Sequence, residues 1–379
     1  MRPEHISPPP RASARGTSAS TPAVPAIGTP AAAAPDSASD PGAAATIRHG
    51  KVAVVEWERG RPALHLQGTD GTGRARVHFT GVRDPLPNQS PDVPPVTDET
   101  ILAIGHLRWS PDGERLAVVV AVALDQSEVV VLDAAGGARV ASVNSQVVTT
   151  DVAWSADGRW LAYGMSTLAH AGAVEVFVTS VEQDAVRQVT RGAQLGRGTR
   201  LRFVGGDRAL LLSRVIGERG APLFEPVSRV DQIDVASGAT RLVADAVLGE
   251  VQGVEGDGDW ALTIRRIGVL PDGEYDRRLI RTPLAGAGPE RVLVNGGKLQ
   301  YATLAAGPSL AGAAGAAGAA GAGPDALALL AIDTAVGPTP AYAYDLVTAR
   351  DGAPRRVRLP AIDATATAVD VWVPRDARP

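Results

Sequence analysis

Cysteine is absent from this sequence, and aromatic residues and net charge are both scarce. Without cysteine, its 379 residues cannot form disulfide bonds, haem thiolate ligands or cysteine zinc sites. Hydrophobic residues make up 45% of the chain but aromatic residues only 4%, so the core must consist mainly of Val, Leu, Ile and Ala. A formal net charge of −4 argues against a nucleic-acid-binding protein that relies on a basic surface.

Long hydrophobic runs are also missing. No stretch reaches the roughly 18 apolar residues of a membrane-spanning helix. Residues 1–46 are dominated by Pro, Ala, Ser and Gly, which predicts a disordered tail without the apolar core of a secretory signal. We therefore expect a cytoplasmic protein, or a cell-envelope protein if an upstream signal or anchor lies outside this sequence.

The common catalytic and metal-binding motifs are lacking as well. No G-x-S-x-G turn presents a nucleophile, and no D-x-D-x-D-G run forms a calcium loop. No histidine pair has the i, i+4 spacing of a zinc site. His65 and His78 could meet on neighbouring strands, but no carboxylate stands in clear register with them. The six histidines are His5, His49, His65, His78, His106 and His170. We expect no metal, no cofactor and no catalytic residue.

One sequence motif occurs twice. The stretch "LRWSPDGERLAVVV" begins at Leu107, and "VAWSADGRWLAYGM" begins at Val152. Weaker copies follow in "LRFVGGDRALLL", "GVEGDGDWALTI" and "GPDALALLAI". In each copy an apolar run ends at a turn that Asp-Gly or a similar pair can form, and a second apolar run follows. Two further strands complete a repeat of about 45–50 residues, which predicts a propeller blade of four antiparallel strands.

The WSPDG and WSADG phrases, with the strand and "VLDAAGG" turn that follow, resemble the repeats of TolB-type propellers. They also resemble the propeller domains of the prolyl oligopeptidase family. The resemblance covers most of the chain from about residue 47 and implies six blades. No peptidase domain follows the repeats, so the second resemblance implies no peptidase activity here.

Spacing places the blades and closes the ring. Five blades are predicted at about 104–143, 149–190, 199–243, 250–294 and 299–359. Residues 47–80 supply three strands of another blade, and residues 364–376 supply one unassigned strand. We expect these two segments to share blade one, which closes an all-β, six-bladed propeller over residues 47–376. A seventh blade is the alternative if segment 81–100 contains strands, and a Gly/Ala insert at about 310–323 interrupts blade six.

The repeated turn residues have a structural interpretation and a functional one. The tryptophans are expected to pack between blades, although one could stack on a ligand. The Asp-Gly pairs are expected to shape turns and not to bind calcium. These repeat residues are Trp109, Asp112, Gly113, Trp154, Asp157, Gly158, Asp257, Gly258 and Trp372.

The connecting segments point to a binding surface. Turns between second and third strands open on the same face as the links between blades, and this face carries four long segments: 81–100, 164–173, 214–228 and 265–278. Loops on a rigid scaffold are common binding sites, although ordinary solvated loops are the alternative. Six arginines could form a cationic rim here: Arg214, Arg219, Arg265, Arg266, Arg277 and Arg278.

The absent motifs and uneven loops favour a non-enzymatic, monomeric scaffold that binds a protein or peptide and no nucleic acid. The alternative is an enzyme or small-ligand binder, of the lyase or lactone hydrolase type, that uses the central channel. The inner strands offer His106, Arg108, Asp151, Arg200, Arg202 and Asp370 for that purpose. Convergence of three or more of them on one axial pocket would favour the enzyme.

Overall fold

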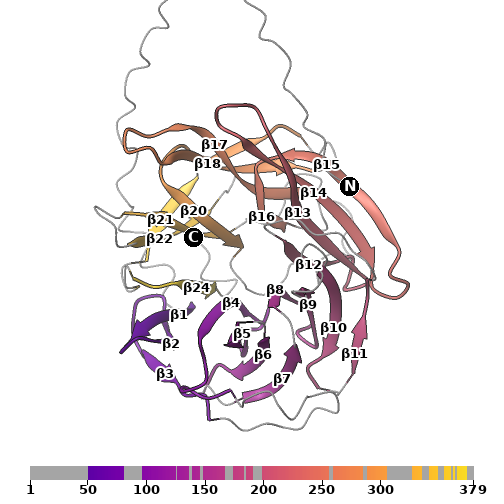
Figure 1. Ribbon diagram of the computed structural model, residues 1–379, viewed down its shortest axis with the longest axis vertical. Helices are drawn as coiled ribbons and strands as arrows, with labels where there is room; N and C mark the ends of the chain where they lie inside the picture. The colour runs from indigo at the N-terminus through magenta and orange to yellow at the C-terminus, as the bar shows by residue number, and fades with distance from the viewer. Residues whose placement is uncertain are drawn as a thin grey trace, which may run out of the picture. The chain divides into compact units, whose positions relative to one another are not determined.

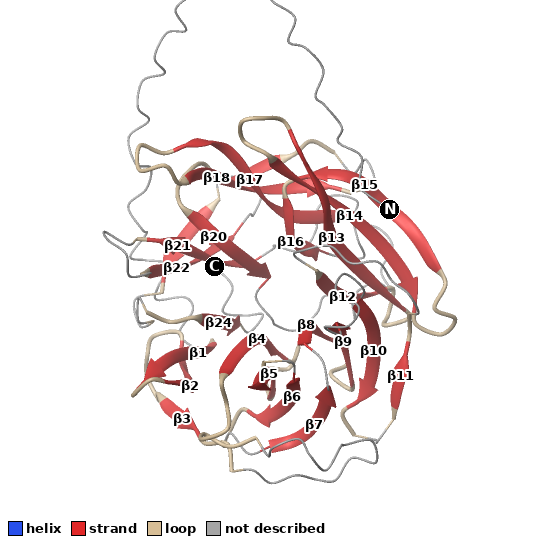
Figure 2. Ribbon diagram, viewed as in Figure 1, coloured by secondary structure: helices blue, strands red, loops and turns tan. Residues whose placement is uncertain are grey.

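The computed structural model describes most of the chain beyond its first 49 residues. The described ranges are 50–80, 96–124, 126–135, 139–145, 148–166, 174–182, 185–190, 199–255, 259–284, 288–304, 327–334, 341–348, 354–359, 362 and 365–373. Throughout these ranges the regular structure consists of strands without a helix (Figure 2). The predicted N-terminal tail and the Gly/Ala insert lie outside the described residues.

Twenty-four strands form six four-stranded antiparallel sheets, the blades of a propeller (Figure 1). From the innermost strand outward, blade 1 comprises β24 (Ala368–Trp372), β1 (Lys51–Glu58), β2 (Arg61–Gly68) and β3 (Ala75–Val77). Blade 2 comprises β4 (Ala103–Trp109), β5 (Arg115–Ala123), β6 (Gln126–Asp133) and β7 (Arg139–Ser145). Blade 3 comprises β8 (Val148–Trp154), β9 (Trp160–Ser166), β10 (Val174–Ser180) and β11 (Val186–Gln188).

The other three blades follow in chain order around the ring. Blade 4 comprises β12 (Arg200–Val204), β13 (Ala209–Arg219), β14 (Glu225–Asp234) and β15 (Thr240–Leu248). Blade 5 comprises β16 (Glu250–Glu255), β17 (Trp260–Val269), β18 (Tyr275–Pro283) and β19 (Arg291–Val294). Blade 6 comprises β20 (Leu299–Leu304), β21 (Leu327–Asp333), β22 (Tyr342–Thr348) and β23 (Arg355–Arg358).

The first and last strands of the chain close the ring, as predicted. β24 pairs antiparallel with β1, in a register that runs from Lys51↔Trp372 to Val55↔Ala368. The Thr367 N–H also donates to the Val55 carbonyl at 2.8 Å. Blade 1 therefore takes its inner strand from the C-terminal segment and its other three strands from the N-terminal one.

The core lies between the blades and not within a single sheet. Six hydrophobic clusters each join residues of two neighbouring blades, and together they cover all six junctions of the ring. Because the second strand of a blade is covered on both faces, its sequence is a nearly continuous apolar run. β5 shows this in "RLAVVVAVA", where six of nine residues are buried, five of them in the run Leu116–Val120.

The repeated Asp-Gly phrase forms the turn between the first and second strands of blades 2 and 3. Asp112 accepts the Ser110 hydroxyl at 2.6 Å and the Glu114 N–H at 2.9 Å. Gly113 follows with a φ of 73°, and Gly158 in the equivalent turn has a φ of 70°, a region that favours glycine. Asp157 repeats the hydrogen bonds of Asp112, with Ser155 and Arg159 as its donors. The third Asp-Gly pair of the repeats, Asp257-Gly258, lies outside the described residues.

The predicted blade boundaries agree with the sheets, and the ring contains six blades. The segment that could have carried a seventh lies mostly outside the description, at 81–95. Its described end forms one isolated bridge, Thr80↔Thr97, and the chain then enters β4.

Candidate functional site

The two ends of each blade carry different connections. Turns between the first and second strands, and between the third and fourth, open at one end. Turns between the second and third strands, and the links to the next blade, open at the other end. We call this second end the connection face, and it is the surface for which the sequence predicted recognition.

Two of the four segments predicted as long loops are paired strands. The β13–β14 ladder continues to Arg219, and the β17–β18 ladder continues to Val269. The turns at the connection face therefore shrink to 220–224 and 270–274. The prediction of long loops at 214–228 and 265–278 is therefore wrong, because two long hairpins hold these side chains in register.

Glycine near the ends of the two hairpins explains why their strands were predicted as loops. Gly217 and Gly268 each follow a shift in register, a bulge where one strand carries an extra residue. Such a residue interrupts the alternation of buried and exposed side chains by which strands are recognised. The other two predicted segments are only partly described: β9 ends at Ser166, and residues 167–173 and 81–95 lie outside the description.

The six predicted arginines lie on the two long hairpins but do not form one rim. In blade 5, Arg265 is directly opposite Arg278, and Arg266 is directly opposite Arg277. Opposed residues project from the same side of a sheet and successive residues from opposite sides. Each side of the β17–β18 hairpin therefore carries one arginine pair.

Three of these arginines have separate surroundings. Arg214 reaches the buried Asp231 at 3.2 Å. Arg265 donates from Nη1 to Glu290 at 2.9 Å and from Nε to the Leu248 carbonyl at 2.9 Å. Arg219, at the end of β13, is exposed. These contacts spread the charge over both sides of the hairpins and do not concentrate it.

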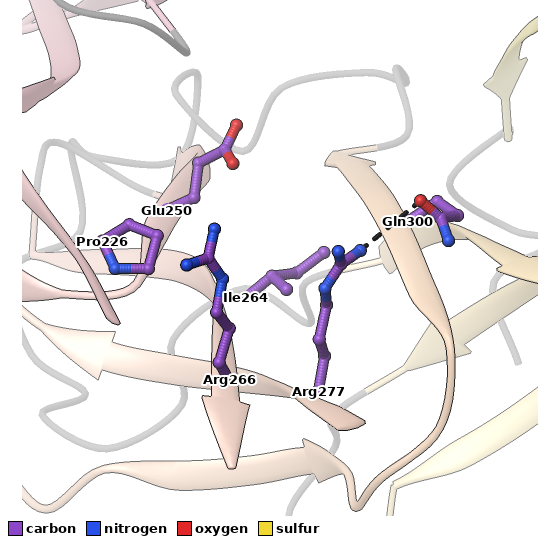
Figure 3. A pocket seen from close by; sticks show the side chains of 6 residues that line it. All are labelled: Pro226, Glu250, Ile264, Arg266, Arg277 and Gln300. Atoms are coloured by element: carbon purple, nitrogen blue, oxygen red, sulfur yellow. Dashed lines mark hydrogen bonds between the residues drawn. The ribbon is translucent and has the colours of Figure 1, made fainter. Parts of the chain in front are cut away.

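The other pair, Arg266 and Arg277, lines a pocket of about 300 Å³ (Figure 3). The lining comes from blades 4, 5 and 6: Pro226, Glu250, Ile264, Arg266, Arg277 and Gln300. Glu250 begins the inner strand β16, and Gln300 is the second residue of the inner strand β20. The pocket therefore has walls from three blades and lies toward the connection-face end of the inner strands of blades 5 and 6.

Arg266 is held by the turn of the neighbouring blade. Its Nη1 donates to the Leu223 carbonyl at 3.1 Å and to the Phe224 carbonyl, and its backbone N–H donates to Glu225 Oε2 at 2.7 Å. Its guanidinium carbon lies 4.3 Å from the centre of the Tyr275 ring. Among the described residues, nothing accepts a hydrogen bond from its Nε or Nη2. These contacts fix the side chain and leave donors for a ligand.

Arg277 points into the same pocket from the opposite strand (Figure 3). Its Nη1 donates to the Leu299 carbonyl at 2.6 Å and to Gln300 Oε1 at 3.4 Å. Loss of solvent contact lowers the pKa of Arg277, and the positive charge of Arg266 lowers it further. Its Nε and Nη2 have no hydrogen-bond acceptor in the described part of the chain. The two cations repel each other, so an anion between them would be favoured.

Glutamates around the pocket moderate this positive charge. Glu218 Oε1 lies 3.7 Å from Arg266 Nη1. Glu225 has one buried oxygen, Oε1, without a hydrogen-bond partner in the described structure, and loss of solvent raises the pKa of this carboxyl group. Glu250 lines the pocket but forms no ion pair within 4.0 Å with a described residue. The local net charge is therefore small, although two guanidinium groups face the cavity.

A second polar region lies on the inner strands around the ring centre. Three buried side chains of blades 1, 3 and 5 hold the inner strand of the following blade. Each accepts a backbone N–H of that strand: Asp370 Oδ2 from Trp109 at 2.9 Å, Asp151 Oδ2 from Leu201 at 2.8 Å, and Gln252 Oε1 from Ala302 at 3.3 Å. The repeat tryptophans add to these junctions, since Trp109 Nε1 donates to the Asp370 carbonyl and Trp154 Nε1 donates to the Arg108 carbonyl. Trp372 occupies the end of β24.

Four of the six predicted axial residues converge. The second oxygens of Asp151 and Asp370 are buried without a hydrogen-bond partner among the described residues. Arg108 lies between them, 3.5 Å from Asp151 Oδ1 and 3.9 Å from Asp370 Oδ1. His106 Nδ1 lies 3.7 Å from Asp151 Oδ1. These separations exceed hydrogen-bond length, so both carboxylates keep an acceptor available.

The axial residues have altered acidities. Burial lowers the pKa of His106 to about 4, an effect that the negative charge of Asp151 partly opposes and that Arg200 and Arg108 reinforce. Burial raises the pKa of Asp370 to about 6 against the opposing charge of Arg108. The charge of Arg202, the sixth candidate, instead acts on Glu255, where it partly opposes the rise in pKa that burial causes. Near neutral pH the imidazole of His106 is therefore neutral, and the carboxyl group of Asp370 is mostly ionised.

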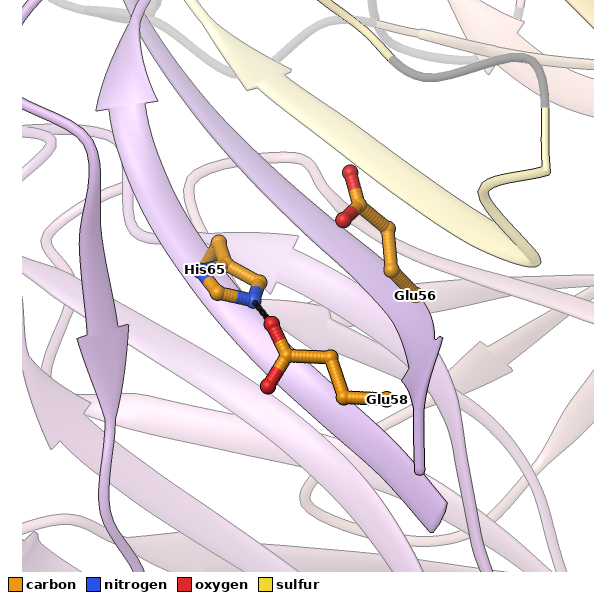
Figure 4. A group of neighbouring side chains, drawn as sticks. All are labelled: Glu56, Glu58 and His65. Atoms are coloured by element: carbon orange, nitrogen blue, oxygen red, sulfur yellow. Dashed lines mark hydrogen bonds and ion pairs between the residues drawn. The ribbon is translucent and has the colours of Figure 1, made fainter. Parts of the chain in front are cut away.

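Blade 1 carries a cluster that the sequence analysis missed. Glu58 Oε1 lies 2.8 Å from His65 Nε2, and Glu56 is beside them, so a carboxylate does reach His65, although the register partner of His65 is Val54 (Figure 4). The period-two spacing of Glu56 and Glu58 could have revealed it. Arg74 pairs with Glu56 at 2.5 Å and Arg76 with Glu58 at 2.7 Å, which neutralises both carboxylates. His78 does not meet His65 but bonds Asp98 at 2.9 Å.

Exposed apolar side chains gather on the connection face. The described residues include eleven large apolar side chains that are exposed to solvent. Seven of them lie at the strand ends, turns or links of this face: Trp57, Leu102, Leu124, Ile216, Phe224, Leu248 and Val269. Phe224 is 51% exposed in the turn that holds Arg266, and Val269 is 56% exposed at the end of β17. The arginine pocket and these apolar side chains therefore share one face.

None of the described residues forms a helix long and apolar enough to span a membrane.

Comparison with one solved structure supports the fold. No protein-family model matches the chain, and no curated protein sequence matches it. Among solved structures, TolB from Acinetobacter baumannii is similar with a TM-score of 0.55 at 14% identity, covering 86% of this chain and 67% of TolB. An uncharacterised protein from Listeria monocytogenes is similar at 0.42 and 10% identity, covering 80% and 77%. A prolyl endopeptidase structure is similar at 0.39 and 14% identity, covering 86% of this chain but 43% of that enzyme. The chain has the six-bladed propeller fold of TolB.

Proposed function

We propose that the chain is a non-enzymatic scaffold that binds a protein or peptide through its connection face. The observation that carries the proposal is the gathering of seven of eleven exposed large apolar side chains on that face. Exposed apolar groups with polar residues around them are typical of protein-binding surfaces. The monomeric state and the cytoplasmic or cell-envelope location stay predictions from the sequence.

The geometry of the hairpins supports the same function. The β17–β18 ladder includes Val269, and Phe224 ends the short turn of β13–β14, where its N–H donates to the Gly220 carbonyl at 2.8 Å. A surface that is already ordered binds with a smaller loss of conformational entropy than a flexible loop. Such a face suits the recognition of one partner better than a set of mobile loops would.

Site-specific photo-crosslinking in the native host tests the proposal. A photoreactive phenylalanine analogue at Phe224 should yield a discrete adduct with a protein, because this position is exposed on the binding face. The control carries the analogue at Trp160, which is exposed at the opposite end of blade 3. Adducts of the same mass and yield from both positions, or from Trp160 alone, would contradict the proposal.

The axial cluster supports a second candidate function, small-ligand binding or catalysis at the ring centre. Its specific support is the convergence of four of the predicted axial residues, two of which are buried carboxylates that each keep one oxygen without a hydrogen-bond partner in the described structure. Their other oxygens hold neighbouring strands, which is a structural role and weakens this candidate. Substituting His106 by Asn should leave partner crosslinking from Phe224 unchanged if the scaffold proposal is right. If the intact chain hydrolysed a lactone and the His106→Asn variant did not, the axial function would be favoured.

A further inference from the structure

We propose that the Arg266–Arg277 pocket binds a carboxylate group of the partner, either its C-terminus or an acidic side chain. This inference rests on the proposed function and adds the chemistry by which the connection face recognises its partner. It depends on the pocket, the free donors and the charge balance around them.

The two guanidinium groups are positioned but incompletely bonded. Each uses Nη1 on backbone carbonyls, Arg266 on the 220–224 turn and Arg277 on Leu299. Each keeps Nε and Nη2 without an acceptor among the described residues. These two nitrogens of one guanidinium group form the edge that can bond both oxygens of a carboxylate. The pocket therefore presents two such edges on side chains that are already fixed.

Placing two cations side by side has an energetic cost, which an anion would remove. Arg266 and Arg277 are directly opposed in the ladder, where like charges destabilise a sheet. Loss of solvent contact lowers the pKa of Arg277, and the positive charge of Arg266 lowers it further. A charged ligand between them would turn this repulsion into two attractive contacts. Such an arrangement is typical of a binding site and unusual for a purely structural one.

Nearby acids favour a singly charged ligand. Glu250 lines the cavity, and Glu218 lies 3.7 Å from Arg266, so the surroundings already contain negative charge. A carboxylate adds one charge, whereas a phosphate adds almost two and would be repelled more strongly. Pro226 and Ile264 supply apolar walls for the carbon atoms attached to the carboxylate. A cavity of about 300 Å³ can accept a single amino-acid side chain or chain end but no large ligand.

The test uses the full chain and small probes. Arginine Nε–H resonances in ¹⁵N NMR spectra report on the pocket, assigned with Arg266→Lys and Arg277→Lys. Propionate should shift these resonances in a saturable manner, and Arg277→Gln should weaken its binding about tenfold or more, because a charge-assisted bidentate contact is lost. Arg219→Gln is the matched control, since it removes an exposed arginine of the same face outside the pocket and should leave the affinity unchanged.

Three short peptides identify the source of the carboxylate. Acetyl-Ala-Ala-Leu with a free C-terminus offers a chain end, acetyl-Ala-Glu-Ala-amide offers a side chain, and acetyl-Ala-Ala-Leu-amide offers neither. Binding of either of the first two with loss in Arg277→Gln supports the proposal. Equal binding of the neutral peptide, tighter binding of inorganic phosphate, or equal affinity in Arg277→Gln and Arg219→Gln would overturn it.

This experiment needs no natural partner. If the probes fail while Phe224 still crosslinks to a protein, the carboxylate proposal is wrong and the docking face stands. If the probes bind while Phe224 yields no adduct, the pocket stands and the proposed function is wrong.

Discussion

The ring centre and the blade 5 pocket are both built from arginines and carboxylates, yet they differ in what completes them. At the centre, Asp151 and Asp370 each accept a backbone N–H from the next inner strand, so their charge is part of the framework. In the pocket, Arg266 and Arg277 face each other across a ladder. We infer that charges bonded to backbone across a blade junction are structural, whereas the opposed Arg266 and Arg277, with donors left without an acceptor among the described residues, are arranged to bind a ligand.

The largest effect is expected from removing the strand that closes the ring. Deleting residues 364–379 removes Asp370 from the ring centre and leaves β1 as an open edge. It also removes the buried side chains of Val369, Val371 and Val373. Burying one such side chain contributes about 1.5–3 kcal/mol, a large part of a typical stability of about 5–15 kcal/mol.

The truncated chain should therefore aggregate or unfold, as measured by size-exclusion chromatography and circular dichroism. Its control is deletion of residues 1–45, a segment with little apolar content, which should leave the melting temperature unchanged. A truncated monomer that melts within a few degrees of the full chain would show that closure contributes little.

A smaller effect, about 3–5 kcal/mol, is expected for Asp151→Ala. The substitution leaves the Leu201 N–H without its acceptor and removes the carboxylate that faces Arg108 and His106. Arg277→Gln, the matched change in the pocket, should cost less than about 1 kcal/mol, because the lost bond to Leu299 is offset by relief of repulsion. Urea denaturation measures both. Equal losses of unfolding free energy in Asp151→Ala and Arg277→Gln would contradict the distinction between structural charges at the ring centre and ligand-binding charges in the pocket.

Folding shifts the pKa values of His106 and Asp370 at the ring centre in opposite directions. The pH dependence of stability therefore tests the same comparison. The pKa of His106 is lowered to about 4, so the folded chain binds fewer protons there than the unfolded chain, and stability rises with pH from about 4 to 6.5. The pKa of Asp370 is raised to about 6, so the folded chain binds more protons there, and stability falls as pH rises from about 3.8 to 6. In the intact protein the two dependences oppose each other.

Substitution should separate these two contributions. Asp370→Asn leaves His106 alone, so stability should rise more steeply with pH between 4 and 6. His106→Asn leaves Asp370 alone, so stability should rise less steeply or fall; asparagine suits the positive φ of 35° at this position. Urea midpoints measured at intervals of pH give the slopes. Identical slopes in the intact chain and both variants would show that neither group is perturbed by folding.

The sequence predicted the architecture well because the repeat is itself a physical signal. The Asp-Gly turns recur at a fixed spacing, and runs such as Leu116–Val120 require burial on both faces of a sheet. The C-terminal strand could be assigned because blade 1 lacked an inner strand and Trp372-Val373-Pro374 aligned with Trp109-Ser110-Pro111. Closure of the ring followed from these observations.

The candidate sites were harder to predict because they depend on register. The sequence placed the six arginines on long loops, because glycine at the two bulges made their paired strands look like loops. Only the ladder shows that Arg266 opposes Arg277 and that Arg265 turns to the other side. Likewise, the sequence named the axial residues without showing that Asp151 bonds Leu201, fifty positions away. Such contacts join residues of neighbouring blades, so no local sequence pattern reveals them.

The smallest effect is expected for Arg265, which lies on the other side of the hairpin from its neighbour Arg266 and has an acidic partner there. Arg265 pairs with Glu290, whose side chain is 45% exposed, and exposed ion pairs contribute about 0.2–1 kcal/mol. Arg265→Gln should therefore shift the urea midpoint slightly and leave propionate binding unchanged. Arg266→Gln should weaken propionate binding, because it removes one of the two unpaired guanidinium edges. Salt sharpens the contrast, since screening should weaken propionate binding in both the intact chain and Arg265→Gln. If Arg265→Gln weakened propionate binding as much as Arg266→Gln, charge on the whole hairpin would matter and the pocket geometry would not.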